Sequence, residues 1–377
     1  MDNICDEGLC TGCGLCTVQC PRKCITMIST GKFGHLYPNI DNNSCIDCGL
    51  CKRNCPALIN TEKRKPKTAY AAWSKDEEDY KSSTSGGAAS IFTQHIISKS
   101  GVVYGCAMLP NIEASHIRVD NYEDSMKLKG SKYVQSDITN IMPILKKDVK
   151  EGKSVLFIGT PCQVAAIKSS YKEQPQNLLL IDLVCHGVPS LQLLKKHVKR
   201  IADYPHYDNV FFRDGNIIGL VLKVNGHVVY KQQLKKPRYK EWYINTFFDG
   251  YTYRESCYNC KYACPDRVSD ITIGDFWGLG KKQPADEIPL HQYGCSLILP
   301  NTEKGLYMIE QIKPKMYLYE RSIDEAINGN DQLKRPFKMN RRIRVFRKFY
   351  HLFGYQLYYW VLADKVVKTK IKTILGK

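Results

Sequence analysis

The stretch CTGCGLCTVQCP at residues 10–21 returns as CIDCGLCKRNCP at residues 45–56. Both copies follow the pattern C-x2-C-x2-C-x3-C-P, and a glycine follows the second cysteine each time. Ten of the 17 cysteines of the chain fall within its first 55 residues. This repeat defines the N-terminal segment of the chain.

Three cysteines at this spacing bind three corners of one [4Fe-4S] cubane, and the fourth ligates the neighbouring cluster. One cluster is therefore expected on Cys10, Cys13, Cys16 and Cys55, and the other on Cys45, Cys48, Cys51 and Cys20. The alternative, a pair of zinc knuckles, uses two CxxC pairs per metal and needs neither the third cysteine nor the proline. Cys5 and Cys24 fall outside both frames and are interpreted as non-ligands. Residues 5–56 resemble bacterial two-cluster ferredoxins.

Composition excludes several classes of protein. The 17 cysteines in 377 residues are too few for a small disulfide scaffold. The N-terminus lacks the basic and apolar regions of a signal peptide, and no stretch of 18 apolar residues indicates a membrane span. We expect a cytoplasmic location, where thiols stay reduced and cysteines serve metal or redox chemistry.

Four segments are expected along the chain. Residues 1–60 form the two-cluster ferredoxin domain, and the charged stretch TEKRKPK at residues 61–67 is a linker. In residues 68–333, apolar runs such as 154–159 and 178–184 alternate with amphipathic helices, which predicts a mixed α/β sheet covered by helices. Residues 217–232 read as a hairpin turning at Asn225-Gly226. Residues 334–377 form a basic helical tail, so the fold class combines α+β and α/β parts.

A second group of cysteines lies beyond the linker. Cys257, Cys260 and Cys264 have metal-ligand spacing and precede a proline, so a fourth ligand must come from elsewhere. We expect a third [4Fe-4S] cluster, with a three-thiolate zinc site as the competitor. Cys185, at the end of the strand 178–184, is favoured as fourth ligand, and Cys162, at a helix N-terminus, is the alternative.

Clusters carry single electrons, and a flavin would link them to two-electron chemistry. Ser85-Gly86-Gly87 opens a helix with small residues whose amides could hold a phosphate, although a serine-rich helix cap explains the same residues. No G-x-G-x-x-G follows a strand, so the ordinary dinucleotide fingerprint is absent.

Five motifs occur in a fixed order: STSGG at 83–87, KGSKYVQS at 129–136, VLFIGTPCQ at 155–163, DLVCHGVPS at 182–190 and SDITIGDFWG at 269–278. Together they resemble the coenzyme F-420 hydrogenase/dehydrogenase beta subunit family. The resemblance implies a flavoprotein that binds FAD beside a cluster and exchanges electrons with a two-electron partner, which makes residues 68–333 a flavin- and cluster-binding oxidoreductase domain.

The resemblance also implies site residues. Those expected around FAD are Ser85, Gly86, Gly87, Gly130, Ser131, Lys132, Gly159, Thr160, Pro161 and Gln163. Lys132 would be the charge partner of the cofactor. Asp270 and Asp275 would orient the third cysteine group, or else cap backbone amides in a buried turn.

The basic charge is localised at the C-terminal end of the chain. Residues 334–377 hold 13 Lys and Arg against one acid, Asp364, which is +12 of the net +18. Ile343, Phe346, Tyr350, Phe353 and Leu357 recur at helical spacing. This pattern fits a peripheral helix on anionic lipid at the inner membrane face, with Tyr358, Tyr359 and Trp360 at headgroup depth, or a helix packed on the body with a solvated basic face. Nucleic-acid binding is not expected, because no nucleic-acid-binding module accompanies the charge.

The sequence thus predicts an iron–sulfur flavoprotein oxidoreductase that passes electrons between [4Fe-4S] clusters and FAD. Its partner would be a redox protein or a small molecule that takes two electrons. The alternatives are an electron-transfer subunit with no substrate of its own and a cluster-based redox or iron sensor. No catalytic residue is assigned.

Overall fold

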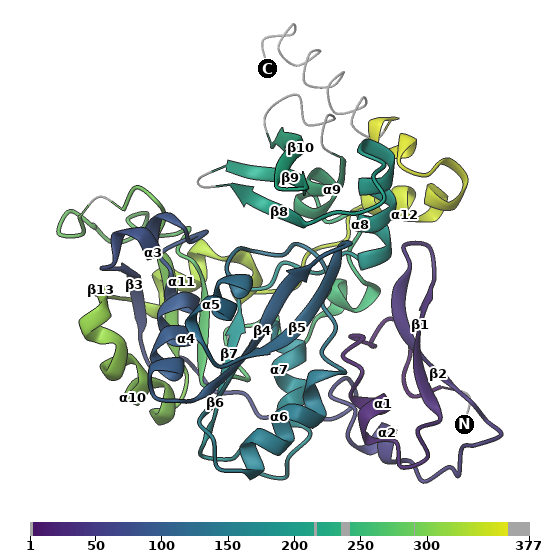
Figure 1. The fold of residues 1–377 in the computed structure, drawn as a ribbon, viewed down its shortest axis with the longest axis horizontal. Helices are drawn as coiled ribbons and strands as arrows, with labels where there is room; N and C mark the ends of the chain where they lie inside the picture. The colour runs from purple at the N-terminus through teal and green to yellow at the C-terminus, as the bar shows by residue number, and fades with distance from the viewer. Residues whose placement is uncertain (1–2, 215–216, 235–241, 290, 361–377) are drawn as a thin grey trace, which may run out of the picture.

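The computed structural model describes residues 3–214, 217–234, 242–289 and 291–360. Figure 1 shows three parts: a small cysteine-rich unit, a large sheet covered by helices, and a small sheet with helices at its side. Within these described ranges, no helix is long and apolar enough to cross a membrane.

The sequence repeat produces a structural repeat in the cysteine-rich unit. Helices α1 (Leu15–Gln19) and α2 (Leu50–Arg53) each begin after a glycine with left-handed φ, +70° at Gly14 and +69° at Gly49. Only glycine adopts this backbone without strain. Between them lies the antiparallel hairpin of β1 (Ile25–Thr30) and β2 (His35–Ile40), in which Ile25 pairs with Ile40.

The large sheet has eight strands in the order β13-β3-β12-β11-β7-β6-β4-β5. Its centre is parallel, from β11 through β7 and β6 to β4, and the outer strands are antiparallel. The expected mixed sheet is confirmed. The strands are β3 (Ala69–Ser74), β4 (Val102–Leu109), β5 (Glu113–Val119), β6 (Val155–Gly159), β7 (Leu178–Leu183), β11 (Ile271–Asp275), β12 (Ser296–Pro300) and β13 (Met316–Arg321).

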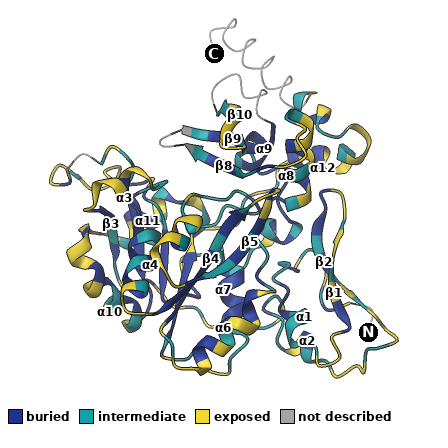
Figure 2. Cartoon of the chain, viewed as in Figure 1, coloured by how far each residue is buried: buried dark blue, intermediate teal, exposed yellow. Residues whose placement is uncertain are grey.

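Helices cover both faces of this sheet, because successive side chains of a strand point to opposite faces. Leu178 and Leu180 pack with α6 (Ile141–Lys150) and α7 (Pro161–Lys168). Leu179 and Ile181 pack with α4 (Ala88–Ser98) and α10 (Glu303–Ile312). Figure 2 shows the strands buried between these layers. The shorter helices are α3 (Glu77–Lys81), α5 (Tyr122–Ser125) and α11 (Ile323–Gly329), with 3-10 turns η1 (Met126–Leu128), η2 (Glu255–Asn259), η3 (Lys313–Lys315) and η4 (Asp331–Leu333).

The small sheet has the order β10-β9-β8 and contains the expected hairpin. Its strands are β8 (Asn209–Asp214), β9 (Ile217–Val224) and β10 (His227–Gln233). Asn225 and Gly226 both have positive φ at the turn. An aromatic core joins this sheet to α8 (Leu191–Ile201), α9 (Trp242–Phe248) and α12 (Arg341–Phe353).

Helix α12 packs on the body of the protein. Ile343, Phe346 and Tyr358 are fully buried in the aromatic core, and Leu357 is buried too. These apolar side chains, which could have contacted lipid, pack in the protein core instead. This part of the tail therefore follows the alternative of a helix packed on the body. Phe353 and Trp360 remain exposed. The rest of the basic tail, residues 361–377, lies outside the described residues.

Candidate functional site

The structure brings cysteines of the two motifs close together. The thiol pKa of Cys16 is raised by burial and then by the nearby charges of Cys13, Cys10, Cys55 and Cys51, so Cys55 and Cys51 of the second motif both lie near the first motif. Burial also raises the pKa of Cys51, and Cys20 contributes to that shift from the first motif. We call Cys10, Cys13, Cys16 and Cys55 the inner group, and Cys45, Cys48, Cys51 and Cys20 the outer group.

The two cysteines outside the motifs contact the groups without belonging to them. Cys5 forms side-chain hydrogen bonds with Cys10 and Cys55, which raise its pKa. The sulfur of Cys24 lies 3.4 Å from that of Cys20. Each thiol therefore packs against one group.

The inner group faces the large sheet. Cys13 packs against the core under α6 and α7. The amide of Gln135 donates to the carbonyls of Thr11 at 3.2 Å and Gly12 at 3.4 Å, and the Tyr262 hydroxyl donates to Pro56 O at 2.9 Å. In the outer group, by contrast, Cys48 is exposed. The two groups thus differ in their access to solvent.

A third group forms at the carboxyl ends of two strands. Cys162 lies in the first turn of α7 and Cys185 follows β7, while Cys257 and Cys260 lie in and just after η2. Burial raises the pKa of Cys162 and of Cys257 to about 12 each. Burial and then the charges of Cys257 and Cys162 raise the pKa of Cys185. Both candidates for the fourth position therefore lie with Cys257 and Cys260.

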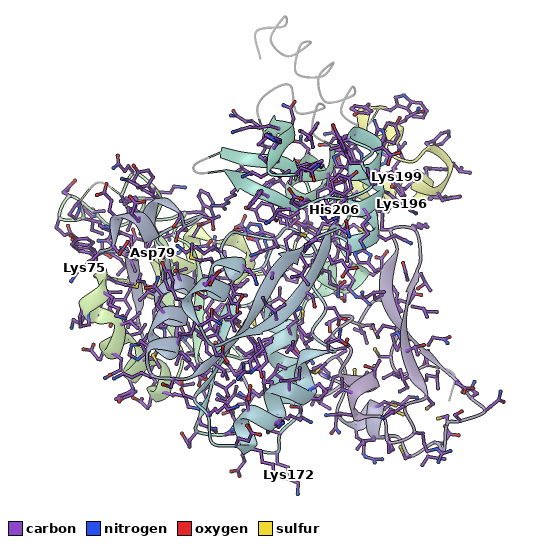
Figure 3. All side chains as sticks on the ribbon, in the orientation of Figure 1. Lys75, Asp79, Lys172, Lys196, Lys199 and His206 are labelled. Atoms are coloured by element: carbon purple, nitrogen blue, oxygen red, sulfur yellow. The ribbon has the colours of Figure 1, made fainter. Side chains whose placement is uncertain are left out.

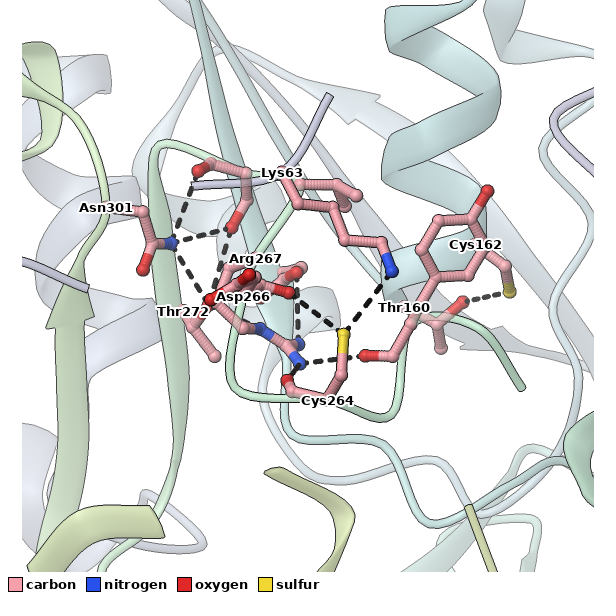
Figure 4. A network of polar contacts seen from close by, with 12 residues as sticks. Lys63, Thr160, Cys162, Cys264, Asp266, Arg267, Thr272 and Asn301 are labelled. Carbon is pink, nitrogen blue, oxygen red and sulfur yellow. Dashed lines mark hydrogen bonds and ion pairs between the residues drawn. The ribbon is translucent and has the colours of Figure 1, made fainter. Parts of the chain in front are cut away.

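Cys264 also lies near this group, because its charge is among the causes that raise the pKa of Cys260, and its sulfur contacts Lys63 (Figure 4). Its sulfur is 3.4 Å from Lys63 Nζ and 3.2 Å from Asp266 O. Its loop is held by Arg267, which donates to Cys264 O at 3.2 Å and pairs with the buried Asp182 at 3.1 Å. The sequence spacing groups Cys264 with Cys257 and Cys260, and the fold brings Cys162 and Cys185 near those two as well.

A cavity of about 550 Å³ opens beside the third group. Its lining includes most of the expected cofactor residues: Ser85, Gly87, Gly130, Ser131, Lys132, Gly159, Thr160 and Gln163. Cys185 also lines it, so the cavity and the third group share a wall. A volume of this size is in the range of ligand sites that bury a cofactor-sized molecule.

Two expected residues do not line the cavity. A Cβ on Gly86 would lie 2.0 Å from Ala72 O, so this glycine permits close packing on β3. Pro161 is buried as the first residue of α7, where its missing N–H costs nothing. Both residues shape the backbone behind the cavity.

One end of the cavity is suited to an anionic group. The hydroxyl of Ser85 is buried without a hydrogen-bond partner among the described atoms. Beyond the Cα of Gly130 there is open space. Lys132 Nζ donates to Lys129 O at 2.7 Å and Leu128 O at 2.9 Å, and burial lowers its pKa to about 8.

The loop that carries these residues is tied to helix α3. Lys129 Nζ lies 2.7 Å from the carboxylate of Asp79, a buried residue labelled in Figure 3. Ser90 Oγ and Gln94 Nε2 of α4 donate to the same carboxylate oxygen, at 2.5 and 3.2 Å. Asp79 thus joins the loop to two helices.

The side of the cavity next to α7 is lined by polar side chains that hydrogen-bond to one another in sequence. Gln163 Oε1 accepts from Thr160 N at 3.0 Å, and its amide donates to Ser136 O at 3.1 Å. His116 Nε2 donates to Ile158 O at 3.0 Å, so Nδ1 accepts from the Ser136 hydroxyl at 3.1 Å. Burial lowers the pKa of His116 to about 4, which keeps the ring neutral.

Sequence reasoning missed the residues that close the other end. Arg213 of β8 donates to Tyr133 Oη at 2.7 Å, to Thr84 O, and to Asp275 at 2.9 Å. This arginine ties the small sheet to the cavity. Because β8 lies far from the motifs in sequence, only its single positive charge within an aromatic strand could have indicated the contact.

Asp270 and Asp275 form bonds with other groups than the third cysteine group. Asp275 pairs with Arg213. The carboxylate of Asp270 accepts from Leu180 N at 2.9 Å, Gln174 Nε2 at 2.7 Å and Thr302 Oγ1 at 2.9 Å. The expectation that they orient the third cysteine group is wrong, and Asp270 is the buried turn residue of the alternative.

Two family models match parts of the chain. Residues 152–326 match the family described as the C terminus of the coenzyme F420 hydrogenase/dehydrogenase beta subunit, and residues 9–59 match the 4Fe-4S dicluster domain. A chain from a structure of the F420-reducing [NiFe] hydrogenase complex of Methanosarcina barkeri is similar over 71% of this chain and 91% of its own length. Its identity of 16% and TM-score of 0.45 are too low to support an argument. No match was found among curated proteins.

The family matches have a functional meaning. The dicluster domain together with the hydrogenase-type region supports an iron–sulfur oxidoreductase with a role in electron transfer. Residues 152–326 are thus similar to the C terminus of the coenzyme F420 hydrogenase/dehydrogenase beta subunit, and a 4Fe-4S dicluster domain lies ahead of them at residues 9–59.

Proposed function

We propose that this protein is an iron–sulfur flavoprotein that relays electrons through three [4Fe-4S] clusters to FAD, for two-electron reduction or oxidation of a partner. The observation that carries the proposal is the position of Cys185. It belongs to the third cysteine group and lines the cavity. A cluster on that group would lie directly beside a cofactor in the cavity.

The ligands proposed for the N-terminal clusters are the inner and outer groups. For the third cluster we propose Cys162, Cys185, Cys257 and Cys260, with Cys264 outside the set. Burial raises the pKa of all four thiols. A positively charged iron core would reverse this effect, because a bound metal deprotonates a coordinating thiol.

The cavity fits a flavin dinucleotide by its residues. Ser85, Gly87 and Gly130 would receive the phosphates, and Lys132 would supply positive charge. Thr160 and Gln163, held by their mutual bonds, would form the wall beside the ring system. A bound flavin supplies the exchange between one-electron and two-electron transfers.

Exposure suggests the order of the relay. Cys48 of the outer group is exposed, the inner group is docked on the body, and the third group shares a wall with the cavity. Electrons exchanged with a redox partner protein would pass the outer cluster, the inner cluster and the third cluster in turn. A cofactor in the cavity would exchange these electrons with a small molecule or with the cofactor of a partner.

Metal and flavin analysis of anaerobically purified protein tests the proposal. We expect about 12 Fe and one FAD per chain, since three cubanes hold four irons each. About eight Fe without flavin would contradict it and leave an electron carrier with two clusters. Flavin with turnover only in the presence of a protein partner would favour an electron-transfer subunit without its own substrate.

Single cysteine variants test the ligand assignment. Cys162→Ser and Cys185→Ser should each lose about four of the irons, because a cubane with a missing thiolate is released. Cys264→Ser is the matched control and should keep the full iron content. Iron loss in Cys264→Ser, with full iron in Cys162→Ser, would overturn the assignment.

A further inference from the structure

Arg254 is a buried cation that joins two of the cysteine groups. Its side chain is fully buried, and it is among the largest fully buried side chains of the protein. Its backbone N–H donates to Val188 O at 3.0 Å, and its carbonyl accepts from Cys257 N at 3.0 Å. The backbone of Arg254 therefore belongs to the third cysteine group.

The guanidinium reaches into the inner group. Nη2 lies 3.4 Å from the sulfur of Cys10, and Nε donates to Cys10 O at 2.6 Å. Nη2 also donates to Leu36 O at 2.7 Å, and Nη1 to Gln135 Oε1 at 3.3 Å. These bonds fix the cation against one cysteine of the inner group.

The residues around the guanidinium of Arg254 leave it little room to take another position. The guanidinium lies 4.1 Å from the centre of the Tyr37 ring. A Cβ on Gly12, which has φ +66°, would be 2.5 Å from Nη1. Gly12 is therefore the residue of the first motif that leaves room for the arginine.

The charge of Arg254 has no carboxylate partner within 4 Å in the described part of the chain. A buried cation is costly unless a negative charge compensates it. An iron–sulfur cluster with four thiolates is negatively charged, and it gains one more negative charge when it takes up an electron.

We propose that Arg254 is a positioning residue that raises the reduction potential of the inner cluster relative to the outer one. The inference rests on the proposed ligands of the inner group. Hydrogen bonds to the sulfurs and nearby charge are recognised determinants of cluster potential. Because the added electron makes the cluster more negative, the cation stabilises the reduced form more than the oxidised form. Electrons from the exposed outer cluster then move towards the body.

Anaerobic redox titration followed by EPR tests this assignment. Arg254→Met should shift the midpoint potential of one N-terminal cluster to lower values and leave the other unchanged. Arg254→Lys keeps the charge but loses the fork of hydrogen bonds, so its potential should lie between those of Arg254→Met and the wild type. Arg118→Met, which removes a cation whose partners are Asp120 and Asp148, should shift none.

The shifted signal can be assigned to a group. In a Cys48→Ala background, where the outer cluster lacks a ligand, the Arg254→Met shift should persist. Unchanged potentials in Arg254→Met with full iron content would overturn the proposal, as would an equal shift in Arg118→Met.

A measurement on the wild type covers the case in which Arg254→Met fails to fold. Pulsed ENDOR of the reduced protein should show an exchangeable proton at the inner cluster that disappears in D2O, as expected for an N–H···S bond. Its absence would contradict the proposal. If the wild type held no N-terminal clusters at all, the proposed function would fail first, and the two failures are therefore distinguishable.

Discussion

Single residues at this site have tasks that their neighbours in sequence do not predict. Cys257, Cys260 and Cys264 share one short segment, but Cys264 contacts Lys63 and a backbone carbonyl. The position of a thiol depends on the turn that carries it, and the carbonyl contacts of Arg267 hold this turn. Spacing therefore identifies candidate ligands without fixing the contacts of each sulfur.

At the same scale, His116 makes the stability of the protein pH-dependent. Burial holds its folded pKa at about 4, below the ordinary 6.5, so the unfolded chain binds a proton first as the pH falls. The stability contribution of this residue is lost between pH 6.5 and 4, by about 2 kcal/mol at pH 5. His116→Gln should weaken this dependence, as measured by melting temperatures at pH 7.5 and 5.

His35 adds to the same pH dependence of stability. Burial lowers its pKa to about 3, so it contributes in the same direction and some pH dependence should remain in His116→Gln. An identical loss of stability in the variant and the wild type between the two pH values would contradict the role of His116.

At the scale of elements, local patterns predicted most of the helices and strands around the cavity. Helix α7 begins at Pro161 with a capping box of Thr160 and Gln163, and α8 begins after its cap Ser190. The strands β5, β11, β12 and β13 were not predicted. The places of β11, β12 and β13 in the sheet depend on pairing with strands distant in sequence, such as β7 for β11 and β3 for β12 and β13.

Ser190 joins two elements through one hydroxyl. Its oxygen accepts from Leu193 N at 3.0 Å as the cap of α8, and its hydroxyl donates to Phe33 O in the turn between β1 and β2. Loss of a cap costs about 1 kcal/mol, and the freed buried carbonyl adds about 1–3 kcal/mol. Ser190→Ala should therefore cost more stability than an ordinary cap mutation in urea unfolding.

Ser322→Ala is the matched control for Ser190→Ala. Ser322 caps α11 by accepting from Glu325 N at 3.2 Å. This variant should show the cap cost alone, about 1 kcal/mol. Equal losses in the two variants would mean that the bond to Phe33 contributes nothing.

At the scale of the whole molecule, the cysteine-rich unit is held at both ends. Its cluster-bearing end meets the large sheet through Gln135 and Tyr262. Its hairpin reaches α8 and α12 (Figure 1), where the ring of Phe33 stacks on Phe346 at 6.2 Å and lies 4.8 Å from the guanidinium of Arg347. Two separate contacts fix the inner group against the third group.

Helix α12 should therefore contribute to the stability of the body. Phe346 is fully buried, so Phe346→Ala should lower the free energy of unfolding by about 3–5 kcal/mol. Val345 is 39% exposed, so Val345→Ala should change it by less than about 0.5 kcal/mol. Chemical denaturation measures both, and similar small effects would show that the helix is not part of the folded core.

The sequence by itself determined the repeated cysteine motif and the alternation of strands and helices. Each depends on local spacing or periodicity. Only the tertiary structure decided that Cys162 and Cys185 both join Cys257 and Cys260, that Arg254 reaches Cys10, and that Arg213 closes the cavity. These contacts join residues far apart along the chain, and no local pattern encodes the chain path that brings them together.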